Sequence, residues 1–99
     1  MISIIITTRN EETNISNCIE SIVNSDIDFI YEILLIDNFS NDKTVEIAKR
    51  YSEVKVHVSG FERSSQRNYG VDKSQFDKII FLDADMIISK YLLKEIVNL

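Results

Sequence analysis

Residues 2–12 read ISIIITTRNEE, and this stretch decides the fold class of the chain. It opens with a run rich in β-branched side chains, which is typical of a strand buried on both faces in a parallel sheet. The period then changes, because apolar side chains recur with helical spacing between Ile15 and Val23. We expect an amphipathic helix there, with Glu11 and Glu12 in its first turn, where the helix dipole favours acidic side chains.

Outward from this unit the alternation of strand and helix continues along the sequence. Further strands are expected at 31–36, 54–58 and 78–82, and further helices at 44–51, 62–72 and 88–97. The strands at 31–36 and 78–82 are apolar enough to be buried on both faces. Four strands alternating with four helices predict a three-layer α/β/α fold with a mainly parallel sheet. At this length we expect residues 1–99 to form one domain.

The composition excludes several classes of protein. With 11 Lys and Arg against 16 Asp and Glu, the net charge is −5, and no basic cluster is present that could neutralise a nucleic-acid backbone. A single cysteine, Cys18, excludes an internal disulfide and a four-cysteine zinc site, and it reads as a small buried hydrophobe. No apolar run approaches the roughly 18 residues of a membrane span, so we expect a cytoplasmic protein.

Acidic side chains follow the second and the fourth of the expected strands. Asp37 comes after the second, and Asp83 and Asp85 come after the fourth with the small Ala84 between them. Parallel sheets bind ligands outside the carboxyl ends of their strands, so these carboxylates are expected at one edge. Two such oxygen ligands beside a diphosphate suit Mg²⁺ or Mn²⁺. The alternative is that each aspartate only caps the helix that follows it.

Glycine-rich phosphate loops are absent from the sequence. Neither GxxxxGK[ST] nor GxGxxG occurs, and the only glycines are Gly60 and Gly70. The sequence therefore excludes a P-loop or dinucleotide-binding fold. A phosphate ligand would have to be neutralised by a metal and by arginines, with Arg9 and Arg67 as the candidates.

Five segments, in order, resemble the nucleotide-sugar-binding half of family-2 glycosyltransferases, which are inverting enzymes with a Rossmann-like GT-A fold. They are ISIIITTRNEE at 2–12, CIESI at 18–22, EILLIDNFSNDKTVEIAKRY at 32–51, SSQRNYGV at 64–71 and KIIFLDADMIIS at 78–89. The last segment carries the family's Asp-x-Asp motif at Asp83 and Asp85. The sequence departs from the family pattern at Thr7, where proline is usual, at Arg9, where an aromatic residue is usual, and at Asn38, where a second aspartate is usual.

The resemblance implies a strand order 3-2-1-4 and a donor site for a nucleotide-diphosphate sugar, with uridine the expected nucleoside. By position, Thr8 and Glu11 would lie against the nucleoside, Asp37 would bond the uracil ring, Arg67 would lie near the base or diphosphate, Asp83 would face the ribose or metal, and Asp85 would ligate the metal. The reaction implied is inverting transfer of the sugar to an acceptor hydroxyl in glycan or lipid-linked saccharide synthesis.

The family's catalytic base has no counterpart in this sequence, and this leaves two functions open. One is the donor-binding domain of a glycosyltransferase. The other is a non-catalytic nucleotide-binding or interaction module that needs a separate acceptor-domain chain. A flavodoxin-like or receiver-type domain shares the alternating pattern but expects a fifth strand followed by a lysine. We also expect self-association through the fourth strand or the last helix, and a location in the cytoplasm or peripherally at the cytoplasmic face of a membrane.

Overall fold

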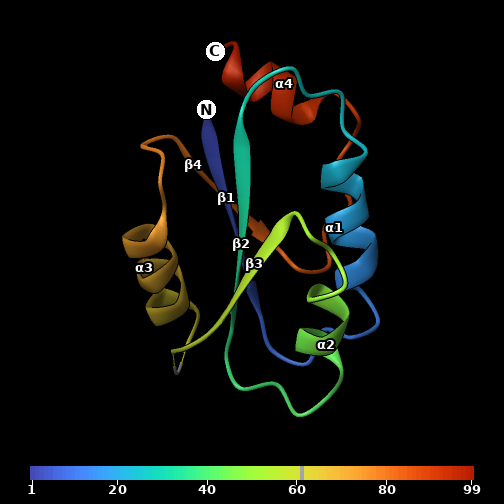
Figure 1. The fold of residues 1–99 in the computed structure, drawn as a ribbon, viewed down its shortest axis with the longest axis vertical. Helices are drawn as coiled ribbons and strands as arrows, with labels where there is room; N and C mark the ends of the chain where they lie inside the picture. The colour runs from blue at the N-terminus through green and yellow to red at the C-terminus, as the bar shows by residue number, and fades with distance from the viewer. Residues whose placement is uncertain (61) are drawn as a thin grey trace.

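The computed structural model describes residues 1–60 and 62–99 and arranges them in three layers (Figure 1). The strands are β1 (Ile2–Thr8), β2 (Tyr31–Asp37), β3 (Val54–Val58) and β4 (Ile79–Asp83). The helices are α1 (Ile15–Val23), α2 (Thr44–Ala48), α3 (Arg63–Lys73) and α4 (Leu92–Val97). Strand and helix alternate as the sequence predicts. In the part of the chain described, no helix has the length and apolarity needed to cross a membrane.

The four strands form one parallel sheet in the order β3-β2-β1-β4, which confirms the expected 3-2-1-4 order. The register brings the strand ends level with one another. Thr8 at the end of β1 pairs with Asp37 at the end of β2, and Thr7 pairs with Asp83 at the end of β4. The polar residues that follow three separate strands are therefore gathered at one edge of the sheet.

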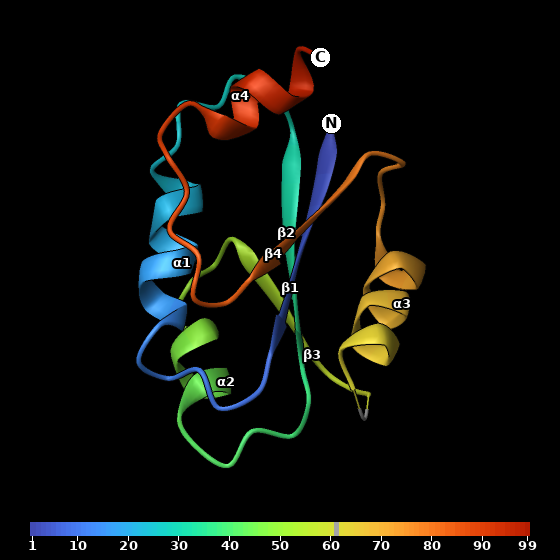
Figure 2. The same cartoon turned by 180° about the vertical axis from the view of Figure 1, so that it is seen from behind.

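The sheet separates two apolar cores of unequal size. The larger one lies between the sheet and helices α1 and α2, while α3 alone covers the opposite face (Figure 2). Successive residues of β1 face opposite sides, so Ile4 and Ile6 pack in the larger core and Ile5 packs in the smaller one with Tyr69 of α3. All three isoleucines are fully buried, as a strand covered on both faces requires.

Several element ends differ from the sequence expectation. The helix expected over 88–97 begins at Leu92, and the helix expected over 44–51 ends at Ala48. Beyond Ala48 the chain tightens into a last turn, because Arg50 and Tyr51 donate to carbonyls three residues back. Glu11 and Glu12 precede α1 instead of lying in its first turn.

Strand β4 is less buried than its apolar sequence suggests. It pairs only with β1, and the side chain of Phe81 is 42% exposed. The expectation of a strand buried on both faces is therefore wrong for β4, because Phe81 faces the α3 side of the sheet and α3 packs mainly on β1 and β2. Self-association through this edge stays a prediction.

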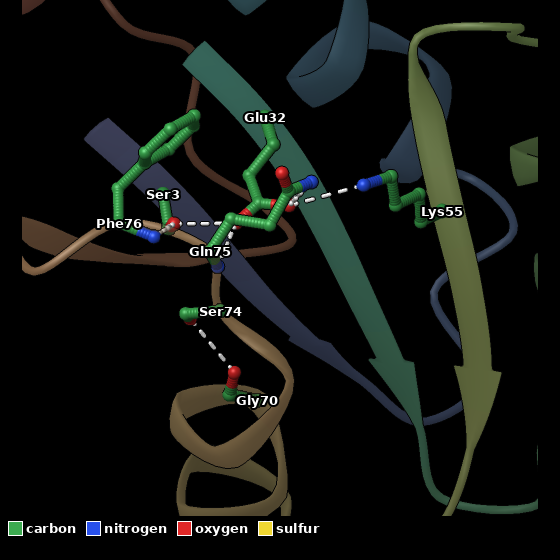
Figure 3. Close-up of polar contacts among 7 residues, drawn as sticks. All are labelled: Ser3, Glu32, Lys55, Gly70, Ser74, Gln75 and Phe76. Atoms are coloured by element: carbon green, nitrogen blue, oxygen red, sulfur yellow. Dashed lines mark hydrogen bonds and ion pairs between the residues drawn. The ribbon is translucent and has the colours of Figure 1, made fainter. Parts of the chain in front are cut away.

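A buried carboxylate holds the end of the sheet opposite the strand tips. Glu32 accepts hydrogen bonds from the Ser3 hydroxyl at 2.6 Å and from the backbone N–H of Gln75 at 2.7 Å (Figure 3). Lys55 of β3 lies 3.3 Å away, and Phe76 N–H donates to the Ser3 hydroxyl at 3.3 Å. Burial alone would raise the pKa of Glu32, but these hydrogen bonds and the nearby ammonium hold it below its usual value. The network fixes the loop that joins α3 to β4.

Candidate functional site

A cavity of about 200 Å³ opens at the carboxyl ends of β1 and β4, beside the first turns of α3. The residues that line it are Thr7, Thr8, Arg9, Glu11, Arg63, Gln66, Asp83, Ala84 and Asp85. This is the position where open α/β sheets bind ligands. Typical ligand sites measure roughly 300–1,000 Å³, so the cavity has room for part of a nucleotide sugar.

The loop after β1, which forms one wall of the cavity, is held by the loop after β2. The backbone N–H of Asn10 donates to the Ser40 hydroxyl at 2.8 Å, and that of Glu11 donates to the Thr44 hydroxyl at 2.9 Å. In return, the side chain of Asn10 accepts the N–H of Asn41 at 2.8 Å. Asn10 adopts a φ of 53°, a left-handed conformation that asparagine tolerates better than most residues. These hydrogen bonds fix the position of the Glu11 backbone at the cavity wall.

Three carboxylates, those of Glu11, Asp83 and Asp85, give the cavity a negative potential. This potential acts on Cys18 of α1, whose buried thiol donates a hydrogen bond to the Asp83 carbonyl at 3.7 Å. Burial, followed by the charges of Asp85, Asp83 and Glu11, raises the pKa of this thiol to about 11. Cys18 is therefore an inert core residue, as its sequence context predicts.

Two arginines contribute positive charge to the same cavity. Arg63, at the start of α3, brings Nη1 to 3.9 Å from Oδ1 of Asp83, and Arg9 donates to the Asn38 carbonyl at 3.4 Å. The sequence singled out Arg9 but passed over Arg63. Arg67 is placed differently, with its guanidinium 5.3 Å from the ring centre of Phe81 and outside the lining of the cavity.

Asp37 is placed beneath the site and not on its surface. It is fully buried, and its carboxylate accepts the Thr8 hydroxyl at 2.6 Å, the Ser40 hydroxyl at 2.6 Å and the Ser40 N–H at 2.8 Å. Of the six residues assigned by resemblance, the structure brings together Thr8, Glu11, Asp83 and Asp85 in the cavity lining, whereas Asp37 and Arg67 lie outside it.

Gln66 is a second lining residue that sequence reasoning missed. It lies on α3, is 4% exposed, and donates both N–H groups of its amide to the carbonyls of Thr8 and Ile36. A glutamine in a polar helix gives no signal that it is buried. A usable clue was its place in SSQRNYGV, four residues before Gly70, because that spacing sets both on the face that packs against the sheet.

The donor set fits a divalent cation of the Mg²⁺ or Mn²⁺ type. Asp83 and Asp85 offer hard oxygen ligands at an open cavity, and such ions take one or two carboxylates and complete their shell with water and phosphate oxygens. Over residues 1–60 and 62–99 there is no cluster of three or more His, Cys, Asp or Glu side chains suited to a metal. The pair therefore suits a cation that arrives with a phosphate ligand.

Comparison with known proteins gives a consistent picture. The family model of "Glycosyl transferase family 2" matches residues 3–99. The poly(ribitol-phosphate) beta-N-acetylglucosaminyltransferase TarS of Staphylococcus aureus is 28% identical over 94% of this chain. Glycosyltransferase AglE of Haloferax volcanii is 32% identical over 85% of this chain. The chain spans 18% of the length of TarS and 30% of that of AglE.

Solved structures share the fold. The crystal structure of S. aureus TarS 1-349 in complex with UDP superposes with a TM-score of 0.87 at 25% identity, covering 98% of this chain and 31% of that one. The mannosyltransferase PcManGT of Pyrobaculum calidifontis, solved with GDP-Man and Mn²⁺, gives a TM-score of 0.86 at 19% identity, over 97% of this chain and 31% of that one. At that identity the second match speaks for the fold alone.

Proposed function

The chain belongs to glycosyl transferase family 2, and from this premise we propose that residues 1–99 bind a UDP-sugar together with a divalent cation as the donor side of an inverting glycosyl transfer. The observation that carries the proposal is the composition of the cavity lining. Carboxylates from the ends of β1 and β4 meet two arginines there, which suits a ligand that combines a diphosphate with a cation. TarS, the relative solved with UDP, has also been solved with UDP-GlcNAc.

Six of the lining residues have a place in this proposal. Asp85 and Asp83 would hold the cation, which when bound supplies Lewis-acid neutralisation of the departing diphosphate. Arg63 and Arg9 add positive charge on the same side and stabilise the diphosphate as it leaves. Thr8 and Glu11 face the nucleoside, whereas Arg67 lies against the ring of Phe81 and outside the cavity lining.

The chemistry is displacement at the anomeric carbon. An acceptor hydroxyl forms the new bond from the face opposite the diphosphate, the bond from the anomeric carbon to the diphosphate breaks, and the hydroxyl proton passes to a base. For residues 1–99 we propose the donor side only, and no residue is assigned as that base. The sugar acceptor belongs to glycan or lipid-linked saccharide synthesis.

Calorimetric titration of UDP into the chain, with and without Mn²⁺, tests this function. We expect Mn²⁺-dependent binding, and Asp85→Asn should abolish the Mn²⁺-dependent part because it removes a ligand charge. Asp28→Asn is the matched control, since Asp28 is exposed and does not line the cavity. Absence of heat with UDP, GDP, CDP and ADP at millimolar concentration would refute the proposal.

A non-catalytic binding module is the second candidate, favoured by the lack of an assigned base. It shares the donor cavity but predicts no turnover of the sugar donor. The two are separated by following UDP-GlcNAc hydrolysis with the purified chain. Release of UDP that disappears in Asp85→Asn and persists in Asp28→Asn would reject the non-catalytic reading.

A further inference from the structure

Gln66 is held between the ends of two strands by its side-chain amide. Its Nε2 lies 2.9 Å from the carbonyl oxygen of Thr8 and 2.8 Å from that of Ile36, so both N–H groups are engaged. The side chain is 4% exposed. The backbone N–H of Gln66 is also engaged, since it donates to the Glu62 carbonyl at 3.0 Å.

These two bonds fix which way the amide faces. In the reversed orientation Oε1 would face the carbonyl oxygens of Thr8 and Ile36. Three acceptor oxygens would then meet without a proton to share, and both hydrogen bonds would be lost. Oε1 is thus the atom directed away from the strand ends. No described residue donates a hydrogen bond to Oε1. Among the described residues, every fully buried side-chain oxygen or nitrogen has a partner, so Oε1 is not fully buried. Because Gln66 lines the cavity, Oε1 is the atom of its amide that remains to accept a hydrogen bond from a ligand there.

The resemblance assigns an acceptor of this kind to Asp37, but the structure gives that carboxylate other partners. Asp37 has no exposed surface, and its carboxylate already accepts hydrogen bonds from the side chain and N–H of Ser40 and from the Thr8 hydroxyl. It is also absent from the cavity lining. Asp37 is therefore enclosed by its neighbours, whereas Gln66 belongs to the lining of the cavity.

We propose that the side-chain carbonyl of Gln66 accepts the imide N–H of the uracil ring and so selects the base of the donor. The inference rests on the proposed function, because it assumes a uridine nucleotide in this cavity. Gln66 binds close to Thr8 and Ile36, at the β1–β2 side of the site, while Asp83 and Asp85 stand at its β4 side. The base and the diphosphate of one nucleotide would occupy these two sides.

The experiment compares two ligands, UDP and the diphosphate of 3-methyluridine, in which a methyl group replaces the imide proton. Calorimetry in Mn²⁺ gives a dissociation constant for each, and their ratio measures discrimination. Wild type should favour UDP by at least about tenfold, because the methylated base leaves a buried acceptor unsatisfied. In Gln66→Met the ratio should fall at least about fivefold, since methionine preserves the length of the side chain but accepts only weakly.

The ratio is measured within one protein, so any general weakening of the site by lost strand contacts cancels. The bulk of the methyl group enters the ratios of wild type and Gln66→Met alike, so it cancels when the two ratios are compared. Gln75→Met is the matched control, because Gln75 belongs to the Glu32 network at the opposite end of the sheet and should retain the wild-type ratio. An equal ratio in wild type and Gln66→Met overturns the proposal. Loss of discrimination in Asp37→Asn but not in Gln66→Met overturns it too, and assigns the base to Asp37.

A second measurement needs no variant. The ¹³Cδ resonance of Gln66 should shift on addition of UDP and much less with the methylated ligand, whereas equal shifts contradict the proposal even if Gln66→Met does not fold. The proposed function is judged separately, by whether wild type binds UDP at all. Tight UDP binding without base discrimination leaves that function standing and removes only the role of Gln66.

Discussion

The hydroxyl of Thr8 donates to the carboxylate of Asp37 at 2.6 Å, joining two residues that are also register partners at the ends of β1 and β2. Both side chains are buried, with Thr8 2% exposed and Asp37 fully enclosed. The bond therefore fixes two strand tips side by side beneath the cavity. The family resemblance places Asp37 on the ligand. In the structure Asp37 instead supports Thr8, which lines the cavity.

Thr8→Val should lower the free energy of unfolding by about 1–3 kcal/mol, because it leaves a buried carboxylate with one donor fewer at nearly constant volume. Urea denaturation followed by circular dichroism measures the change. Thr13→Val, at an exposed loop position, serves as the matched control and should shift stability by less than about 0.5 kcal/mol. Equal stability of the two variants would show that the Thr8–Asp37 bond contributes nothing net.

The Glu32 network should make stability depend on pH in the acid range. The folded-state pKa of Glu32 lies below its unfolded value of about 4.5. The contribution of the ionised carboxylate to the free energy of unfolding is therefore fully present above about pH 4.5 and is lost as the pH falls through the folded-state pKa. Glu32→Gln should flatten this acid limb and cost about 1–3 kcal/mol at pH 7, since it removes a buried acceptor of hydrogen bonds. Urea midpoints measured from pH 7 to pH 3 give the profile. Glu20→Gln, on an exposed face of α1, should retain the wild-type slope, and a Glu32→Gln profile parallel to wild type would contradict the assignment.

Gly70→Ala tests how closely α3 packs on the sheet. A Cβ at this position would lie 2.8 Å from Cγ2 of the fully buried Ile5, so the helix or the strand must move. Overpacking costs about 1–3 kcal/mol, and the helix propensity of alanine returns about 1 kcal/mol. We expect a net loss of up to about 2 kcal/mol in thermal or urea denaturation. Asn68→Ala on the exposed side of α3 should be neutral or stabilising, and the same result for Gly70→Ala would mean that Ile5 yields freely.

Arg63→Gln should weaken UDP binding in Mn²⁺ by about fivefold, roughly 1 kcal/mol, because one positive charge is removed from an exposed position beside the diphosphate. Calorimetry measures the loss, which should shrink as NaCl is raised because salt screens exposed charges. Arg50→Gln removes the same charge from an exposed pair with Glu46 that does not line the cavity, and it should leave binding unchanged. If both variants bind UDP like wild type, Arg63 has no part in holding the diphosphate.

Much of the fold could be predicted from the sequence because the apolar periods are strong. The β-branched run that begins at Ile2 and the helical spacing that begins at Ile15 each allow one kind of element, and their alternation selects a parallel sheet. The sequence predictions are wrong where the exposure of a side chain depends on which elements pack against it. Phe81 lies in an apolar run yet is 42% exposed, because α3 packs mainly on β1 and β2, and no local pattern shows where a helix will lie across the sheet.

The site divides in the same way. That Asp83 and Asp85 end a strand, and that they share an edge with the residues after β1, followed from the sequence through the rule that carboxyl ends of parallel strands lie together. Which polar side chains reach the cavity did not follow. Arg63 and Arg67 are both polar positions of one helix, four residues apart, yet Arg63 lines the cavity while Arg67 packs on Phe81.

By itself, then, the sequence determined the order of the elements, the strand ends that carry carboxylates and the resemblance to family 2, since these depend on residue types and spacing along the chain. Only the tertiary structure decided that Asp37 is enclosed by Thr8 and Ser40 and that Gln66 reaches the cavity with its carbonyl unengaged. The physical reason is that a hydrogen-bonding side chain has several partners within reach of its own segment. The packing of α3 against the ends of β1 and β2 selects which of them it meets.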